Sequence, residues 1–174
     1  MTIDYRSTVE GAQSGFERLV GSIPGYKGYK ERELRREADK LLRTHLAGRL
    51  DEQRGRLVGL MGELTEAGRL SEITDLEKAV LRLQRLIDRL RTAAYGYAGL
   101  FDAVKVEQRQ LDALYQFDLD LTVQVDQIAA MVAALELKVS QEEGIAAETK
   151  ALLGTLQAVN DLFGRRAEAI TGQP

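Results

Sequence analysis

Basic side chains recur at helical spacing in the first half of this chain. One row has successive separations of four, three and four residues, which keep its members on one side of an α-helix. Its members are Lys78, Arg82, Arg85 and Arg89. Such a row of ammonium and guanidinium groups could bind the phosphates of a nucleic acid or of an anionic membrane surface.

A second basic row precedes the first and is interleaved with acidic residues, as is typical of a solvated helix face. Its members are Arg32, Arg36, Lys40 and Arg43. The whole chain has a formal net charge of −3, whereas a phosphate-binding domain is usually strongly basic. We therefore interpret both rows as solvated or intersubunit faces, with an anionic ligand as the alternative.

Glycines form a further row in the same region, with separations of seven, four and three residues. The row consists of Gly48, Gly55, Gly59 and Gly62. They share a narrow helix face that lies nearly opposite Leu50, Leu57 and Leu64. Each glycine costs about 1 kcal/mol relative to alanine inside a helix. The row indicates either a close contact with another helix, across a dimer for example, or a soft and partly frayed helix.

Residues that could carry catalysis are few. The chain has no Cys and a single His, His45, so thiolate chemistry is excluded and a zinc or di-iron site is disfavoured. Glu107 and Asp118 fall on the apolar side of a predicted helix, where paired acids could hold a metal or transfer protons. An acid at such a position more often fixes helix register by meeting an arginine, or marks the place where the bundle opens. We expect no enzyme, no cofactor and no small-molecule substrate, with a carboxylate metal enzyme as the weakest alternative.

Tyrosines mark two segments that flank the predicted helices. Tyr26 and Tyr29 follow a Pro-Gly turn, and Tyr95 and Tyr97 accompany two glycines further along the chain. They could contact a partner or a phosphate. The alternative is that they cover an end of the folded domain.

The elements that must position these residues are predicted to be long α-helices over about 29–67, 75–98, 102–140 and 145–168. The clearest apolar seam alternates steps of four and three residues, which is typical of helices that pack against one another as in a coiled coil. It runs through Leu76, Val80, Leu83, Ile87, Leu90, Ala94, Tyr97 and Phe101. We predict an all-α protein made of antiparallel helical hairpins, in an elongated, coiled-coil-like bundle of three to four helices.

Two arrangements of these helices are compatible with the sequence. The seam stays in phase through Phe101 and Val104, which favours one long helix over 75–140. The first predicted helix would then cover one half of it and the last predicted helix the other half. Asp102 is a suitable N-cap and favours a break, after which the chain would fold back into a compact four-helix bundle. Within this region, Thr74 and Glu77 have the spacing of a capping box and predict a helix start.

The domain organisation follows from these elements. Residues 1–28 form an amphipathic or flexible segment, residues 29–170 form one helical domain, and residues 171–174 form a tail. Residues 1–100 carry 18 basic against 15 acidic side chains, whereas residues 101–174 carry 6 against 12. This polarity can favour folding back, head-to-tail assembly or the choice of a partner. No apolar run approaches the roughly 20 residues of a membrane span, and we expect a cytoplasmic protein.

For function, the sequence favours a non-enzymatic interaction or scaffold protein that presents helix faces to itself, as a homo-oligomer, or to a protein partner. The alternative is a peripheral protein that binds an anionic membrane or nucleic acid through its basic rows.

Overall fold

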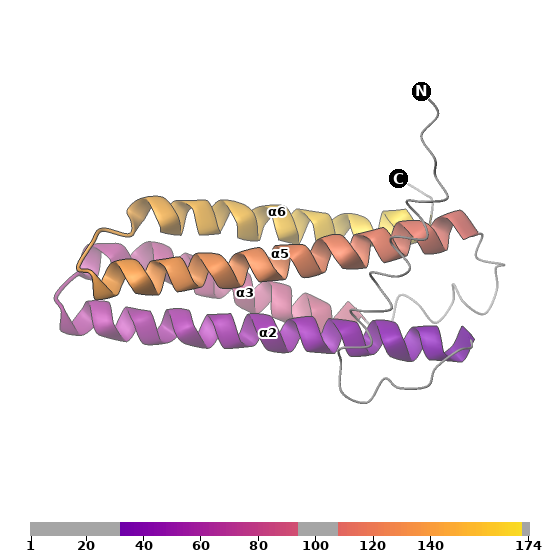
Figure 1. The fold of residues 1–174 in the computed structure, drawn as a ribbon, viewed down its shortest axis with the longest axis horizontal. Coiled ribbons are helices and arrows are strands. Elements are labelled where there is room, and N and C mark those ends of the chain that lie inside the picture. Colours follow the sequence, from indigo (N-terminus) through magenta and orange to yellow (C-terminus); the bar gives the residue numbers. More distant parts are fainter. Residues whose placement is uncertain (1–31, 94–107, 172–174) are drawn as a thin grey trace, which may run out of the picture.

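The computed structural model describes the backbone of residues 32–93 and 108–171, and within these the side chains of residues 40–93 and 116–165. It contains four long helices and one short 3-10 helix, and the described residues include no strand. These are α2 (Arg32–Glu66), η1 (Leu70–Glu72), α3 (Ile73–Thr92), α5 (Gln108–Ser140) and α6 (Ala146–Thr171) (Figure 1). The prediction of an all-α helical bundle is confirmed.

The helices form because each one carries apolar residues at alternating steps of three and four, so one side of every helix can be buried. The buried positions lie at matching levels and make a single continuous core. The main contributors are Leu46, Leu50, Leu57, Leu60 and Leu64 in α2, Leu76, Leu83, Ile87 and Leu90 in α3, Leu121, Val125, Ile128, Val132 and Leu135 in α5, and Leu152, Leu156, Val159 and Phe163 in α6.

The four helices are two antiparallel hairpins, α2–α3 and α5–α6, whose turns lie at the same end of the bundle (Figure 1). Helix α2 packs alongside α5, and α3 packs alongside α6. Each of these neighbouring pairs is parallel, because the turns of both hairpins share one end. The order around the bundle is therefore α2, α3, α6, α5. Helices α3 and α5, which follow each other in the sequence, lie diagonally across the bundle from one another.

This arrangement decides between the two predicted architectures. The Arg82 guanidinium of α3 donates to the Leu153 carbonyl of α6, and Arg56 of α2 pairs with Glu136 of α5. Helices α3 and α5 run in opposite directions, so residues 75–140 are not one straight helix. The continuous helix that the seam favoured is wrong, and the compact four-helix bundle is correct. The last positions of the predicted seam, from Ala94 to Phe101, lie outside the described residues.

The start of α3 also differs from the prediction. The 3-10 turn Leu70–Glu72 leads directly into α3, and its N-cap residue, Glu72, makes no side-chain capping hydrogen bond. Arg69 holds this turn by pairing with Glu72 at 2.6 Å. Because the chain is already helical at Thr74, the predicted capping box of Thr74 and Glu77 lies inside the first turn instead of before it.

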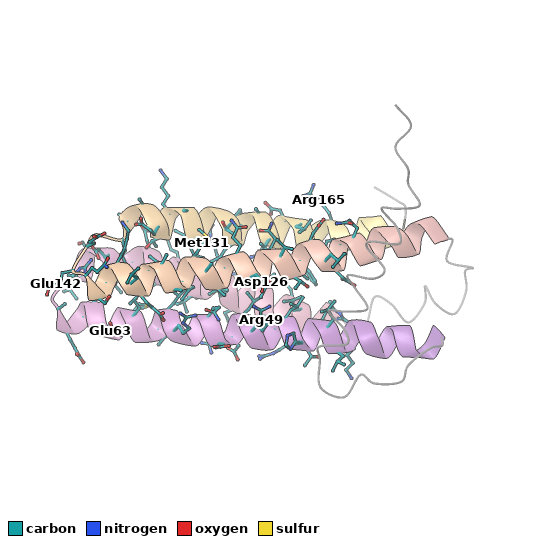
Figure 2. The ribbon with its side chains drawn as sticks, viewed as in Figure 1. Arg49, Glu63, Asp126, Met131, Glu142 and Arg165 are labelled. Atoms are coloured by element: carbon teal, nitrogen blue, oxygen red, sulfur yellow. The ribbon has the colours of Figure 1, made fainter. Side chains whose placement is uncertain are left out.

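Charged residues join the two hairpins along α2 and α5. Arg49 pairs with Asp126 at 2.6 Å, and the Arg56 Nε donates to Glu136 Oε1 at 2.8 Å. Figure 2 shows Arg49 and Asp126 facing each other midway along the bundle. Both pairs join a basic residue of the first half of the chain to an acidic residue of the second, while the roles expected from the overall charge pattern stay predictions.

Candidate interaction surfaces

The interior of the bundle holds few polar residues among the side chains that the structure describes. Its polar members are Arg43, Gln53, Asp118, Thr122 and Thr149. Asp118 is 2% exposed, in agreement with its predicted place on the apolar side of α5. Glu107, the acid predicted beside it, lies outside the described residues. No group of three His, Asp or Glu side chains in the described part of the chain could hold a metal ion.

The basic row of α3 is divided by the packing of α6. Lys78 and Arg85 are exposed, and Lys78 pairs with Asp75 at 2.7 Å. Arg82 Nη1 instead donates to the Leu153 carbonyl of α6 at 2.7 Å, and Arg89 Nη1 donates to the Asn160 carbonyl at 2.7 Å. The Arg89 guanidinium also lies 5.2 Å from the centre of the Phe163 ring, where a cation–π attraction adds to the contact.

The expectation of a uniformly solvated face is therefore wrong for Arg82 and Arg89. Their acceptors on α6 are seven residues apart, as they are themselves, so the two arginines hold α3 and α6 in one register. These two positions flank the apolar seam instead of lying opposite it. In a four-helix bundle the flanks of the seam face a neighbouring helix.

The basic row of α2 is also interrupted. Lys40 is exposed, but Arg43 is only 4% exposed, and its Nη1 lies 3.4 Å from the Leu90 carbonyl of α3. The prediction that Arg43 belongs to a solvated face is wrong, because this position faces the partner helix of the hairpin. Arg32 and Arg36 lie on the described backbone of α2, but their side chains lie outside the described residues. His45, predicted at the edge of the apolar side, is exposed.

The glycine row lies on the outer side of α2. Gly48, Gly55, Gly59 and Gly62 are exposed, and an added Cβ at any of them would meet nothing within 4 Å. Helix α2 continues through all of them, which argues against a frayed segment. No helix within the described part of the chain approaches this row. A contact of this row with another molecule stays a prediction.

A second outer surface was missed by sequence reasoning. Along α5, an exposed face over residues 123–137 runs beside an exposed face of α6 over residues 147–158, and neither carries a charge. We call this surface the α5–α6 face. It consists of Val123, Gln127, Ala130, Ala134, Leu137, Ala147, Ala151, Gly154 and Ala158.

Two members of the α5–α6 face are large and apolar: Val123 is 61% exposed and Leu137 is 58% exposed. The signal was present in the sequence, since Val123, Ala130 and Leu137 recur every seven residues and Ala147, Ala151, Gly154 and Ala158 alternate steps of four and three. It was overlooked because alanine fits a core, a surface or an interface equally well. Only the packing shows which side of each helix remains uncovered.

The electrostatics of the described surface come from short-range pairs. Hydrogen bonds from Arg54 and then Arg91 lower the pKa of Asp51, and the Arg56 guanidinium lowers the pKa of Glu136. At the turn end, the Lys138 ammonium lowers the pKa of Glu148, and Glu148 in return raises the pKa of Lys138. Each shift favours the charged form of a group in an ion pair, so these groups stabilise the fold at neutral pH.

The four tyrosines predicted as contact residues lie outside the described residues: Tyr26, Tyr29, Tyr95 and Tyr97.

None of the described helices has an apolar run of the kind that crosses a lipid bilayer. Comparison with protein-family models, with curated proteins and with solved structures finds no match to this chain.

Proposed function

We propose that this chain is a cytoplasmic, non-enzymatic scaffold or interaction protein that acts through its outer helix faces, on a second copy of itself or on a protein partner. The observation that carries the proposal is the distribution of apolar side chains. The core residues of all four helices are sealed inside the bundle, yet Val58, Leu81, Val123 and Leu137 remain between 48% and 61% exposed on helix surfaces.

Exposed apolar residues that share one helix face with small residues, instead of standing singly, are typical of surfaces that bind another molecule. The glycine row of α2 lies beside Val58, and Ala130 and Ala134 lie between Val123 and Leu137 on α5. Small residues allow helix axes to approach closely, and the larger ones supply apolar area to bury.

The alternative of an anionic membrane or nucleic acid as partner has less support. Arg43 is buried, and Arg82 and Arg89 donate to backbone carbonyls of α6. The described members of the basic rows that stay exposed are Lys40, Lys78 and Arg85. A binding surface for phosphates needs a continuous set of free cations.

Photo-crosslinking in living cells that produce the protein separates a protein-binding function from the binding of membrane or nucleic acid. A photoreactive amino acid replaces Val58, Leu81 or Val123 in separate variants, and exposed Glu77 in a control variant. We expect discrete protein adducts from at least one of the three apolar positions and weaker adducts from Glu77. Adducts to lipid or nucleic acid alone would support the alternative, and the absence of protein adducts at all three would contradict the proposed function.

A further inference from the structure

The α5–α6 face is self-complementary along α5. Val123 and Leu137 each lie seven residues from Ala130, one on either side. If a second α5 packs against the first in the opposite direction, with Ala130 facing Ala130, then Val123 of each copy lies opposite Leu137 of the other. The same alignment places Gln127 of one copy within one residue, about 1.5 Å, of the level of Ala134 of the other. The two large exposed side chains of each copy then cover one another.

The α6 side of the face has complementary charges. Lys150 and Asp161 are both exposed and lie on the same rim of the face. They are eleven residues apart on one helix, about 16 Å, so they cannot pair within one copy. No ion pair joins either of them to another residue of the described part of the chain. If the α6 helices of two copies lie antiparallel and are centred next to Leu156, then Lys150 of each copy lies opposite Asp161 of the other.

Each antiparallel pair is symmetric about one point, which lies at Ala130 for α5 and next to Leu156 for α6. These two centres lie at the same level of the bundle. Lys138 Nζ lies 2.9 Å from Glu148 Oε1, which aligns the two antiparallel helices of the hairpin. Eight residues before Lys138 is Ala130, and eight residues after Glu148 is Leu156. One two-fold axis can therefore pass both centres, as an isologous dimer requires.

We propose that the α5–α6 face binds the same face of a second copy of this chain, in an antiparallel two-fold dimer. The inference rests on the proposed function and names the partner and the surface. Gly154 and the alanines let the helices of the two copies approach closely, Val123 packs on the other copy's Leu137, and two Lys150–Asp161 pairs close one rim. A heterologous partner would not need the matched centres of α5 and α6.

The first test uses the absence of cysteine from the chain. In Ala130→Cys, the new thiol lies near the two-fold axis, within the distance at which two cysteines can form a disulfide. Mild oxidation of the full chain is expected to give a covalent dimer rapidly and nearly completely. The control, Gly59→Cys, places an equally exposed thiol on the outer side of α2 and is expected to dimerise only slowly.

The second test measures the mass in solution by light scattering over a range of concentrations. The wild-type chain is expected to have twice the monomer mass. Gly154→Glu places a carboxylate at the proposed interface, while Gly59→Glu makes the same change on α2, and both sites have open space around them. We expect Gly154→Glu to weaken the dimer at least tenfold and Gly59→Glu to leave it intact, with unchanged circular dichroism in both.

The third test exchanges the charges on the rim. Lys150→Glu and Asp161→Lys should each weaken the dimer, and the double variant should restore it, an outcome that no contact within one copy can produce. A monomeric wild type, a dimer that survives Gly154→Glu, or a double variant as weak as the single ones would overturn the inference. If protein adducts still formed at Val58 or Leu81, the proposed function would stand without this dimer.

Discussion

Gly68 and Glu142 occupy the same position in two different hairpins: each is the second residue beyond a helix, α2 or α5, and each has a positive φ, of 73° and 59° respectively. Both chain reversals are closed by the same hydrogen bonds. Arg69 N donates to the Leu64 carbonyl at 2.8 Å, and Glu143 N donates to the Lys138 carbonyl at 2.9 Å, as in a Schellman motif. Glu142, labelled in Figure 2 at the turn end, does this without the conformational freedom of glycine.

Because the left-handed conformation costs a residue with a Cβ about 1 kcal/mol, Glu142→Gly is expected to raise the free energy of unfolding by about that amount. Gly68→Ala is expected to lower it by a similar amount, since it introduces the same strain in the other turn. Urea denaturation of both variants measures the two effects. Equal stability of Glu142→Gly and the wild type would show that the strain is absent.

Two buried threonines allow a matched comparison of hydroxyl groups. Thr149 is 1% exposed and its Oγ1 has no hydrogen-bond partner in the described structure, whereas Thr122 Oγ1 donates to the Asp118 carbonyl at 2.9 Å. A buried hydroxyl without a partner costs about 1–3 kcal/mol. Thr149→Val is therefore expected to stabilise the fold by about 1 kcal/mol.

The control for this substitution is Thr122→Val, which removes a hydrogen bond worth about 1 kcal/mol. Thermal unfolding should rank Thr149→Val above the wild type and Thr122→Val at or below it. The reverse ranking would mean that the Thr149 hydroxyl is well solvated or bonded in solution.

The contact of Arg89 with α6 should contribute measurably to stability. Arg89→Met keeps the aliphatic stem but removes the hydrogen bond to the Asn160 carbonyl and the cation–π contact with Phe163. We expect a loss of about 1–2 kcal/mol in the free energy of unfolding. Arg85→Met, at an exposed position of the same row, should change it by less than about 0.5 kcal/mol. Equal effects of the two variants would argue against the register contact.

The glycine row of α2 predicts an effect in the opposite direction. Gly55 and Gly59 lie inside a continuous helix with open space where a Cβ would be, so alanine can be added without a clash. Gly55→Ala and Gly59→Ala are each expected to raise the free energy of unfolding by about 0.5–1 kcal/mol. If either substitution also abolished the photo-crosslinked protein adduct at Val58, the glycine row would itself be a contact surface.

The Arg56–Glu136 pair predicts a pH dependence. Arg56 lowers the pKa of Glu136 in the folded state, so the pair stabilises the fold above the pKa that Glu136 has in the unfolded chain. That contribution is lost as the pH falls through the folded pKa, from about pH 5 downward. Arg56→Gln should therefore be less stable than the wild type at pH 7, and the difference in stability should shrink as the pH falls through the lowered pKa of Glu136.

The size of this difference is limited by solvent. The Arg56 and Glu136 side chains remain 32% and 37% exposed, so the pair should contribute about 0.5 kcal/mol at neutral pH. Urea denaturation at several pH values measures it, and the shifted carboxyls of Asp51 and Glu148 affect both proteins equally. A difference between the variants that does not depend on pH would exclude the ion pair as its cause.

The predicted apolar seam is buried in α3 at Leu76, Leu83 and Ile87, because its spacing keeps these residues on one side of a helix. The predicted end of the first helix, at about residue 67, lies one residue from the observed end at Glu66, just before Gly68 with its positive φ. The prediction of a solvated face was wrong for Arg82 and Arg89, because a position beside the apolar seam is expected to be exposed to solvent unless the neighbouring helix is known. The α5–α6 face escaped attention for the same reason.

The sequence by itself determined that this chain forms helices with one apolar side each, since that pattern depends on residues three and four positions apart. Only the tertiary structure decided that α2 lies beside α5 and α3 beside α6, that two arginines of the first hairpin bind backbone carbonyls of the second, and that the outer sides of α5 and α6 stay uncovered. These features depend on groups 71 to 80 positions apart, as in the Arg82–Leu153 and Arg56–Glu136 contacts. No local repeat encodes which helices become neighbours, because every apolar seam in the bundle could pack against any other.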